Sequence, residues 1–483
     1  MTLSDSSHAR RPTSGASSTA LVDHDVLERV LGSALRRGGD FAEVFVEDRS
    51  ATGISLDDRK VEELSSGHDR GAGVRVVVGE TTGFAHTTDL SESGLRAAAE
   101  AASAVARQGG GGTKTVALTE QRFAHPNEIA QRPSDVAKSK KVELLFRADD
   151  VARSKSSSIV QVSAGYGDSR RLTQIANSDG LLTGDERVRT SFVVMCTAAG
   201  DTGLQTGAER LSLTLGFEMF ERRSVEDVAE AAARRAVAKL TARPAPSGVV
   251  PIVLQKGSGG ILFHEACGHG LEADHIAKDT SVYTGRVGDL VASPIVTLVD
   301  DGTVGPEWGC MSVDDEGRPA QRNVLIQDGI LTDYMWDFLR ARKEGRDSSG
   351  NGRRESFRHL PMVRMTNTFL LPGADDPEEI VASTPRGVYV AQLGGGQVNT
   401  ATGDFTFGTR EAYLIENGEI TEPIRDANLI GNGPDVLAKI DAIGTDFDMT
   451  PGTCGKDGQS VPVGTGQPTL RITGVTMGGT ANA

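Results

Sequence analysis

The chain has 483 residues, of which 38% are apolar and 24% charged, the composition of a soluble globular protein with enough apolar residues for two or more domains. A net charge of −15, without a Lys/Arg-rich block, disfavours nucleic-acid binding through a basic face. No segment approaches the roughly 18 consecutive apolar residues of a membrane span.

The N-terminal 20 residues are rich in Ser, Thr and Ala and are predicted to form a disordered tail. They do not read as an export signal, because acidic and basic residues from Asp23 onward interrupt any apolar run. The four cysteines lie far apart and fit no disulfide framework, which favours reduced thiols and a cytoplasmic location.

Residues 21–242 are predicted to form a mixed N-terminal domain of helices and strands. Helical apolar spacing predicts helices over residues 23–37, 91–107, 133–153 and 224–240, with a flexible glycine break at 109–112. Alternating apolar residues predict strands over residues 42–47, 53–57, 74–78, 159–166, 172–177, 181–183, 189–197 and 212–218.

Residues 243–248, with the sequence Arg-Pro-Ala-Pro-Ser-Gly, predict a linker. Beyond it, residues 249–483 contain short strands and Gly-rich turns, with strands predicted over 251–254, 295–299, 323–327, 387–392, 411–416, 419–421 and 469–475. The prediction is therefore an α+β fold: a mixed α/β N-terminal domain followed by a β-rich C-terminal domain that carries one functional helix.

That functional helix carries the strongest chemical signal in the chain. His264, Glu265 and His269 form the pattern His-Glu-x-x-x-His, one residue longer than the zincin motif. Histidines four residues apart on a helix are offset by about 40° and can share one zinc ion, whereas five residues apart they are offset by about 140°. Either the helix widens locally into an i→i+5 turn, which Gly268 would make less costly, or the histidines are ordinary polar residues at a helix start.

A zinc site with two histidines needs a third ligand, and three residues compete for that role. Glu272 and Asp274 follow closely and could bind the metal or orient a histidine. Cys454 lies between two glycines in a polar loop, where Lys456 could help to keep it as a thiolate. Cys267 lies inside the motif but should point elsewhere, so we assign it to packing.

The segment from His264 to Asp274 resembles the signature of the TldD/PmbA family, in particular its TldD-type zinc metallopeptidases. Further blocks resemble the same family in the same order, and the similarity covers most of residues 20–483. These blocks are residues 40–47, 71–76, 358–368, 394–399, 402–405, 411–418 and 453–464.

The resemblance implies a Zn²⁺ ion held by His264, His269 and Cys454, with Glu265 as the catalytic acid and base. It implies hydrolysis of small peptides and unstructured polypeptides, including the maturation of ribosomally made peptide natural products. Family members commonly pair with a homologous TldE (PmbA-like) subunit that lacks the metal motif, so a heterodimer or a homodimer is expected, with the site facing an enclosed cavity. Because this chain keeps all four motif residues, it is expected to be the catalytic subunit.

Two further segments are candidates for substrate binding. Arg358 and His359 could contact the substrate or the transition state, or could simply pair with acids on a strand. Gly395 and Gly396, in the glycine run 394–396, could let a substrate strand approach the backbone closely, or could form a turn.

Two other functions use the same motif residues. One is a non-catalytic modulator or interaction subunit with a structural zinc, and the other is a cysteine peptidase that uses Cys454. Two histidines and one cysteine leave an open coordination position, and a structural site has no use for Glu265. Both points favour the zinc peptidase.

Overall fold

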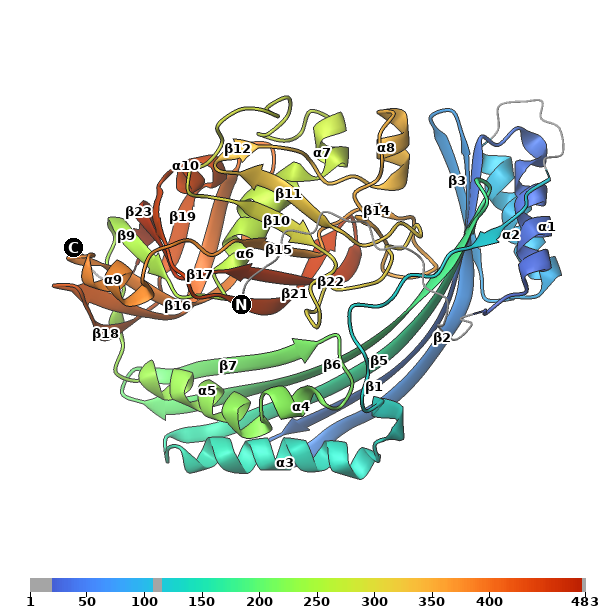
Figure 1. Ribbon diagram of the computed structural model, residues 1–483. Helices are drawn as coiled ribbons and strands as arrows, with labels where there is room; N and C mark the ends of the chain where they lie inside the picture. Colours follow the sequence, from blue (N-terminus) through green and yellow to red (C-terminus); the bar gives the residue numbers. More distant parts are fainter. Residues whose placement is uncertain (1–19, 107–114, 480–483) are drawn as a thin grey trace.

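A computed structural model describes residues 20–106 and 115–479 of the chain. The predicted tail (except residue 20) and the glycine break at 109–112 lie outside these residues. The described part is built from strands and helices in two units, an N-terminal curved sheet and a C-terminal unit that carries the metal motif (Figure 1).

The N-terminal unit is organised on one long, curved, seven-stranded sheet. Its strand order is β3-β2-β1-β5-β6-β4, with β7 also paired to β6, and all pairs are antiparallel except the short parallel pair β4–β6. The strands are β1 (Phe41–Asp57), β2 (Lys60–Val78), β3 (Thr81–Thr87), β4 (Thr119–Glu120), β5 (Ile159–Asn177), β6 (Leu181–Gly200) and β7 (Gly203–Leu213).

The long strands of this sheet correct the sequence prediction. Residues 42–47 and 53–57 belong to one strand, as do 159–166 with 172–177, and 181–183 with 189–197. The polar residues between the predicted pieces stay extended because they pair with neighbouring strands. Arg49, for example, lies opposite Asp69 of β2 and Arg171 of β5. The strand predicted at 212–218 is also wrong, because β7 ends at Leu213.

Four helices cover the convex face of the curved sheet (Figure 1). The apolar stripes of α3 (Lys138–Ser154) and α5 (Val225–Ala238) form one core with β5, β6 and β7. Those of α1 (His24–Ala34) and α2 (Glu92–Val105) form another with β1 and β2. All four lie where helical spacing predicts them.

Side-chain caps explain where three of these helices begin. The Asp23 side chain accepts a hydrogen bond from a backbone N–H at the start of α1, and Ser91 does the same for α2. Ser224 and Asp227 form a reciprocal capping box at α5. A 3₁₀ turn, Pro133–Asp135, precedes α3, and the short helix α4 (Met219–Arg222) precedes α5.

The C-terminal unit lies on the concave side of the sheet and contains two larger sheets (Figure 1). The first has the order β16-β9-β23-β19-β17-β18-β8, with β20 on β23, and β16 also pairs with β17 so that five strands form a closed ring of pairings. Its strands are β8 (Arg243–Pro244), β9 (Gly248–Leu254), β16 (Arg386–Val398), β17 (Asp404–Glu416), β18 (Glu419–Arg425), β19 (Asn428–Asn432), β20 (Ile440–Ile443) and β23 (Leu470–Gly478).

The second sheet has the order β12-β11-β10-β15-β22-β21, and a separate pair joins β13 to β14. These strands are β10 (Leu298–Asp301), β11 (Arg322–Gln327), β12 (Ile330–Leu331), β13 (Gly352–Arg353), β14 (Met362–Val363), β15 (Asn367–Leu370), β21 (Asp448–Lys456) and β22 (Gln459–Gln467). The predicted linker contains β8, which pairs with β18, and the chain runs into β9 at Gly248.

The metal-motif segment lies in the core between these sheets. It begins with α6 (Gly260–Phe263), which packs against β15, β16, β21 and β22. A Cβ atom on Gly260 would lie 2.2 Å from the backbone nitrogen of Gly466, so a glycine is required for this close approach. The other helices are α7 (Ala273–Ala277), α8 (Phe338–Lys343), α9 (Pro377–Ala382) and α10 (Gly433–Ala438). None of the helices described between residues 20 and 479 is long and apolar enough to cross a membrane.

Candidate metal centre

A π-helical turn brings the two motif histidines together. Residues His264–Gly268 form this turn directly after α6, and the backbone N–H of His269 donates to the carbonyl oxygen of His264 in an i→i+5 bond. The two imidazole centroids are 5.1 Å apart. The predicted widening of the helix is therefore confirmed.

Gly268 is needed for packing rather than for backbone freedom. Its φ and ψ of −52° and −52° are helical and open to any residue. A Cβ atom at this position, however, would lie 2.1 Å from Sδ of Met365, so a side chain cannot be added without moving that methionine.

Cys454 reaches the histidines from the second sheet. It lies on β21 opposite Val461 of β22, so the loop expected around it is instead a β-hairpin that turns at Asp457 and Gly458. Its Sγ is 3.4 Å from Nε2 of His269. The candidate ligand atoms of the two histidines and the cysteine all lie within 4.8 Å of one another.

The chemistry of these three residues fits a metal ion. All are buried, with exposed fractions of 2%, 8% and 3% for His264, His269 and Cys454, and Nδ1 of His264 has no hydrogen-bond partner among the described residues. Burial alone would raise the pKa of Cys454, but attraction to His264 and hydrogen bonding to both histidines lower it to about 4. Two imidazoles and a thiolate are a donor set that zinc prefers, and they leave one position open.

Glu272 and Asp274 lie behind His269. Burial would raise the pKa of Glu272, but attraction to His269 and Lys456 lowers it to about 2, so it is a carboxylate. Nδ1 of His269 therefore donates to Oε2 of Glu272, at 3.0 Å, and Nε2 is left to face Cys454. Nζ of Lys456 lies 2.9 Å from Glu272 and 2.8 Å from Asp274, so this lysine neutralises these two acids. The sequence had instead suggested that Lys456 contacts the Cys454 thiolate.

Glu265 lies beside the metal centre at the wall of a large cavity. Its Oε2 is 3.8 Å from Nε2 of His269, and its side chain is 22% exposed. The cavity, of about 720 Å³, lies between the N-terminal sheet and the C-terminal unit. His264 and Glu265 line it from one side, and Met195 and Arg210 of the sheet line it from the other. No motif marks the sheet residues; only the topology places them opposite the metal motif.

The predicted substrate residues divide between the cavity and other places. Gly395 lines the cavity, with no atom within 4 Å of the position of a Cβ, whereas a Cβ on Gly396 would lie 2.1 Å from the ring of Phe407. Both belong to β16, whose register with β17 shifts repeatedly here, so this run is a bulged strand and not a simple turn.

Arg358 and His359 do not line this cavity. Arg358 forms an ion pair with Asp69 of β2, and Nδ1 of His359 is 3.0 Å from Oγ of Ser356. Cys267, which the sequence assigned to packing, is fully buried in the core, and burial raises its pKa to about 12.

A buried set of candidate metal ligands with a carboxylate beside it, at the wall of a cavity, is the arrangement found in metal-dependent hydrolases. Comparison with known proteins narrows this class. Three family models match in order: PmbA/TldA metallopeptidase domain 1 over residues 42–106, the central domain over 131–240 and the C-terminal domain over 247–479. The chain belongs to the PmbA/TldD family of metallopeptidases.

Relatives in bacteria and archaea share nearly the whole chain. The Metalloprotease TldD homolog of Haemophilus influenzae is 41% identical over 92% of this chain and 94% of its own length. A metalloprotease of Methanothermobacter thermautotrophicus is 35% identical over 95% of this chain and 100% of its own. The crystal structure of TldE from Thermococcus kodakarensis has the same fold, with a TM-score of 0.76 at 20% identity over 94% of this chain and 99% of that one.

Proposed function

We propose that this chain is a zinc-dependent peptidase that hydrolyses small peptides or unstructured polypeptides. The observation that carries the proposal is the convergence of His264, His269 and Cys454, with Glu265 beside them, at the wall of a cavity of about 720 Å³. The names of its relatives as metalloproteases support it.

Each residue of the site has a distinct task in this mechanism. His264, His269 and Cys454 would hold the zinc ion, which would lower the pKa of a bound water to about 7 and polarise the scissile carbonyl. The Glu265 carboxylate accepts the proton of the attacking water and returns it to the leaving amine nitrogen. Glu272 accepts a hydrogen bond from Nδ1–H of His269, which keeps the proton on Nδ1 and leaves Nε2 free to bind the metal.

Substrate binding is proposed for the glycine run of β16. Open space beside Gly395 would let an extended peptide pass close to the backbone, and Gly396 keeps the bulge packed on Phe407. Arg358 and His359 lie outside the cavity, and we propose that they contact longer polypeptides that extend beyond it.

The partner proposed for this chain is a homologous TldE-like subunit, or else a second copy of the chain, which would enclose the cavity. The fold shared with TldE of Thermococcus kodakarensis supports a partner of the same shape. Maturation of ribosomally made peptides is the proposed physiological role, and the four free cysteines are compatible with a reducing cytoplasm.

A single comparison tests the catalytic proposal. The protein is purified with and without a TldE-like partner, its zinc content is measured, and a peptide library is digested by wild type, Glu265→Gln and Glu62→Gln. Glu62 also lines the cavity but from β2, so it is a matched control. We expect Glu265→Gln to keep zinc and lose about 10²–10⁴-fold in kcat, with Glu62→Gln close to wild type.

The same experiment separates the other functions. A zinc-loaded Glu265→Gln protein that cleaves at the wild-type rate would exclude the proposed mechanism. Activity that survives chelation but is lost on alkylation would identify a cysteine peptidase, and no cleavage with any partner would favour a non-catalytic interaction subunit.

A further inference from the structure

A second, smaller cavity lies beside the hairpin that carries Cys454. It has a volume of about 240 Å³, and five arginines line it: Arg49, Arg171, Arg189, Arg353 and Arg354. We call this the arginine cavity. Glu355 is the one acidic residue in its described lining, and its carboxylate already accepts a hydrogen bond from the Ser460 backbone. Thr453 borders both this cavity and the one that contains Glu265.

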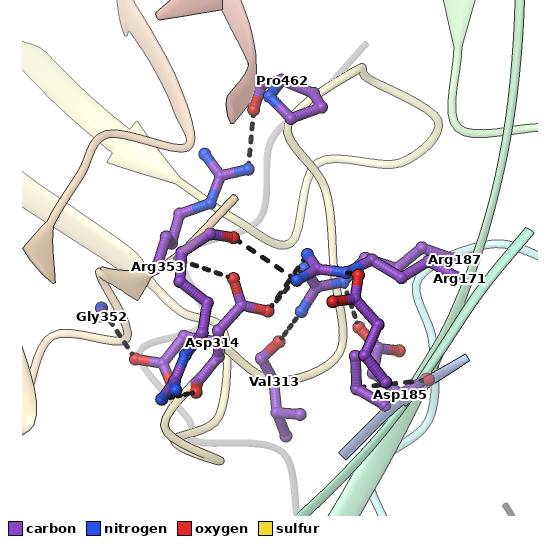
Figure 2. Close-up of polar contacts among 12 residues, drawn as sticks. Arg171, Asp185, Arg187, Val313, Asp314, Gly352, Arg353 and Pro462 are labelled. Carbon is purple, nitrogen blue, oxygen red and sulfur yellow. Dashed lines mark hydrogen bonds and ion pairs between the residues drawn. The ribbon is translucent and has the colours of Figure 1, made fainter. Parts of the chain in front are cut away.

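Two of the five arginines have carboxylate partners. Arg171 lies 2.7 Å from Glu47 and 3.4 Å from Asp315, and Arg354 pairs with Glu43. Figure 2 shows Arg171 beside Arg187, which is bound to Asp185 and to the carbonyl oxygen of Val313. These side chains form a buried network between the N-terminal sheet and the C-terminal unit.

Arg189 and Arg353 bond to backbone carbonyls instead of carboxylates. Arg189 donates from Nε to the carbonyl oxygen of Trp308 at 3.1 Å, and Arg353 donates to the carbonyls of Met365 and Pro462, the latter visible in Figure 2. Within the described residues neither arginine forms an ion pair with a carboxylate, and Asp185 and Asp315 pair with Arg187 instead. Nη2 of Arg189 is buried and has no hydrogen-bond partner in the described part of the chain.

Both arginine residues are deeply buried, with exposed fractions of 6% for Arg189 and 1% for Arg353. Burial, followed by repulsion from Arg187 and Arg353, lowers the pKa of Arg189 to about 9. Burial lowers that of Arg353 to about 10 against the attraction of Asp315. Because a guanidinium keeps its proton at neutral pH, the site holds two positive charges that have no direct ion pair with a carboxylate of the described residues, and such burial is costly.

A small anion would supply the missing charge. The planar fork of a guanidinium matches the two oxygens of a carboxylate or phosphate, and charge-assisted hydrogen bonds of this kind are about twice as strong as neutral ones. The cavity has room for such an anion with water, since one water takes roughly 30 Å³ of liquid. Arg49, exposed on β1, lies at the same cavity and gives a cationic group that faces solvent.

We infer that the arginine cavity is a binding site for a small oxyanion, held by the unpartnered Nη2 of Arg189 and by Arg353, which forms no direct ion pair with a carboxylate of the described residues. Two sources have this chemistry: free inorganic phosphate, and the C-terminal carboxylate of a peptide that extends past Thr453. The second source rests on the proposed peptidase function, whereas the first does not.

Inorganic phosphate is the direct probe of the site. Calorimetric titration and thermal unfolding of the full-length protein are followed with phosphate at constant ionic strength, set with potassium chloride. We expect saturable binding and a rise in Tm for wild type, and a Kd about 10- to 100-fold weaker for Arg189→Gln, because one charge-assisted contact is lost. Arg243→Gln, which removes an exposed arginine paired with Glu422, is the matched control and should bind as wild type does.

Folding of the variant can be checked independently. Arg189→Gln removes a buried charge that lacks a carboxylate partner, so its Tm without phosphate should not fall below that of wild type. Arg189→Lys keeps the charge but loses the planar fork, and should bind phosphate more weakly than wild type even if the glutamine variant does not fold.

The second arm compares a cleavable peptide with its C-terminal amide. A carboxylate site predicts a higher kcat/KM for the free acid in wild type, with the preference lost in Arg189→Gln while cleavage of the amide is kept. If the enzyme prefers the free-acid peptide but does not bind phosphate, the ligand is the peptide carboxylate. If it binds phosphate but cleaves both peptides equally well, the ligand is a free anion. If both effects are absent the oxyanion site is refuted, and cleavage of either peptide would still support the peptidase.

Discussion

His269 shows how much the behaviour of a proposed metal ligand depends on the residues behind it. Its Nδ1 is held by Glu272, a fully buried carboxylate, and Glu272 is held in turn by Lys456. A carboxylate in this position fixes both the tautomer and the ring orientation of a metal-binding histidine. The sequence offered Glu272 both as a ligand and as such an orienting group, and the hydrogen bonds favour the orienting role.

We therefore predict that Glu272→Gln weakens zinc binding by about 10- to 100-fold without removing a metal ligand. The amide keeps the shape of the carboxylate but loses its charge, while Asp274 still pairs with Lys456. Competition with a zinc chelator measures the change. Glu422→Gln, at an exposed position, should leave zinc affinity unaltered; an unaltered affinity in Glu272→Gln as well would refute the orienting role.

Residues that share a motif could be predicted from the sequence, whereas residues that meet only through topology could not. The spacing of His264 and His269 pointed to a widened turn, and family resemblance selected Cys454 among three candidate third ligands. Arg189 and Arg353 come from strands far apart in the chain, and neither lies in a recognisable pattern. Their shared cavity appears only when β6 is packed against the C-terminal unit.

At the scale of elements, the same distinction applies to strands and helices. Helix positions followed from local apolar spacing and capping residues, so α1, α2, α3 and α5 lie close to their predicted bounds. The bounds of the long strands could not be predicted in this way, because polar segments such as the one around Arg49 look like turns until the strands on both sides are known. The periodicity of apolar residues depends on neighbouring residues in the sequence, whereas strand pairing depends on residues far apart in it.

The π-helical turn gives a prediction about stability at this scale. Gly268→Ala places a methyl group against Sδ of Met365, and overpacking of this kind costs about 1–3 kcal/mol. Urea unfolding measures the loss, and zinc content reports whether the turn still aligns His264 and His269. Gly67→Ala on β2 is the control, because no atom lies within 4 Å of its Cβ position. Equal stabilities for the two variants would show that Met365 moves away without cost.

At the scale of the whole molecule, buried ion pairs join the curved sheet to the C-terminal unit. Glu43 of β1 accepts from Arg75 of β2 at 2.9 Å and also pairs with Arg354, while Arg75 lies 2.8 Å from Glu316. All four side chains are at most 1% exposed. Removal of one member leaves its partners as buried charges, which is far more costly than the loss of an exposed pair.

Glu43→Gln is accordingly expected to lower the free energy of unfolding by about 3–5 kcal/mol. The matched control is Asp69→Asn, because the ion pair of Asp69 with Arg358 also joins β2 to the C-terminal unit but is exposed; its loss should cost at most about 1 kcal/mol. Urea unfolding of both variants at neutral pH tests the difference. Similar small losses in the two would mean that water or movement of Arg75 and Arg354 compensates the missing charge.

The same carboxylate makes this junction sensitive to acid. Burial would raise the pKa of Glu43, but attraction to Arg75 and Arg354 outweighs burial and lowers the pKa below its usual value. A carboxyl group whose pKa is lower in the folded than in the unfolded state contributes its full stability above the unfolded pKa, roughly 4.3 for glutamate, and loses it as pH falls through the folded pKa. The stability difference between wild type and Glu43→Gln should therefore be constant above about pH 5 and shrink below about pH 4. Urea unfolding from pH 6 down to roughly pH 3, with a chelator present so that metal release does not contribute, measures this difference; a gap that stays constant over the whole range would show that Glu43 does not titrate on unfolding.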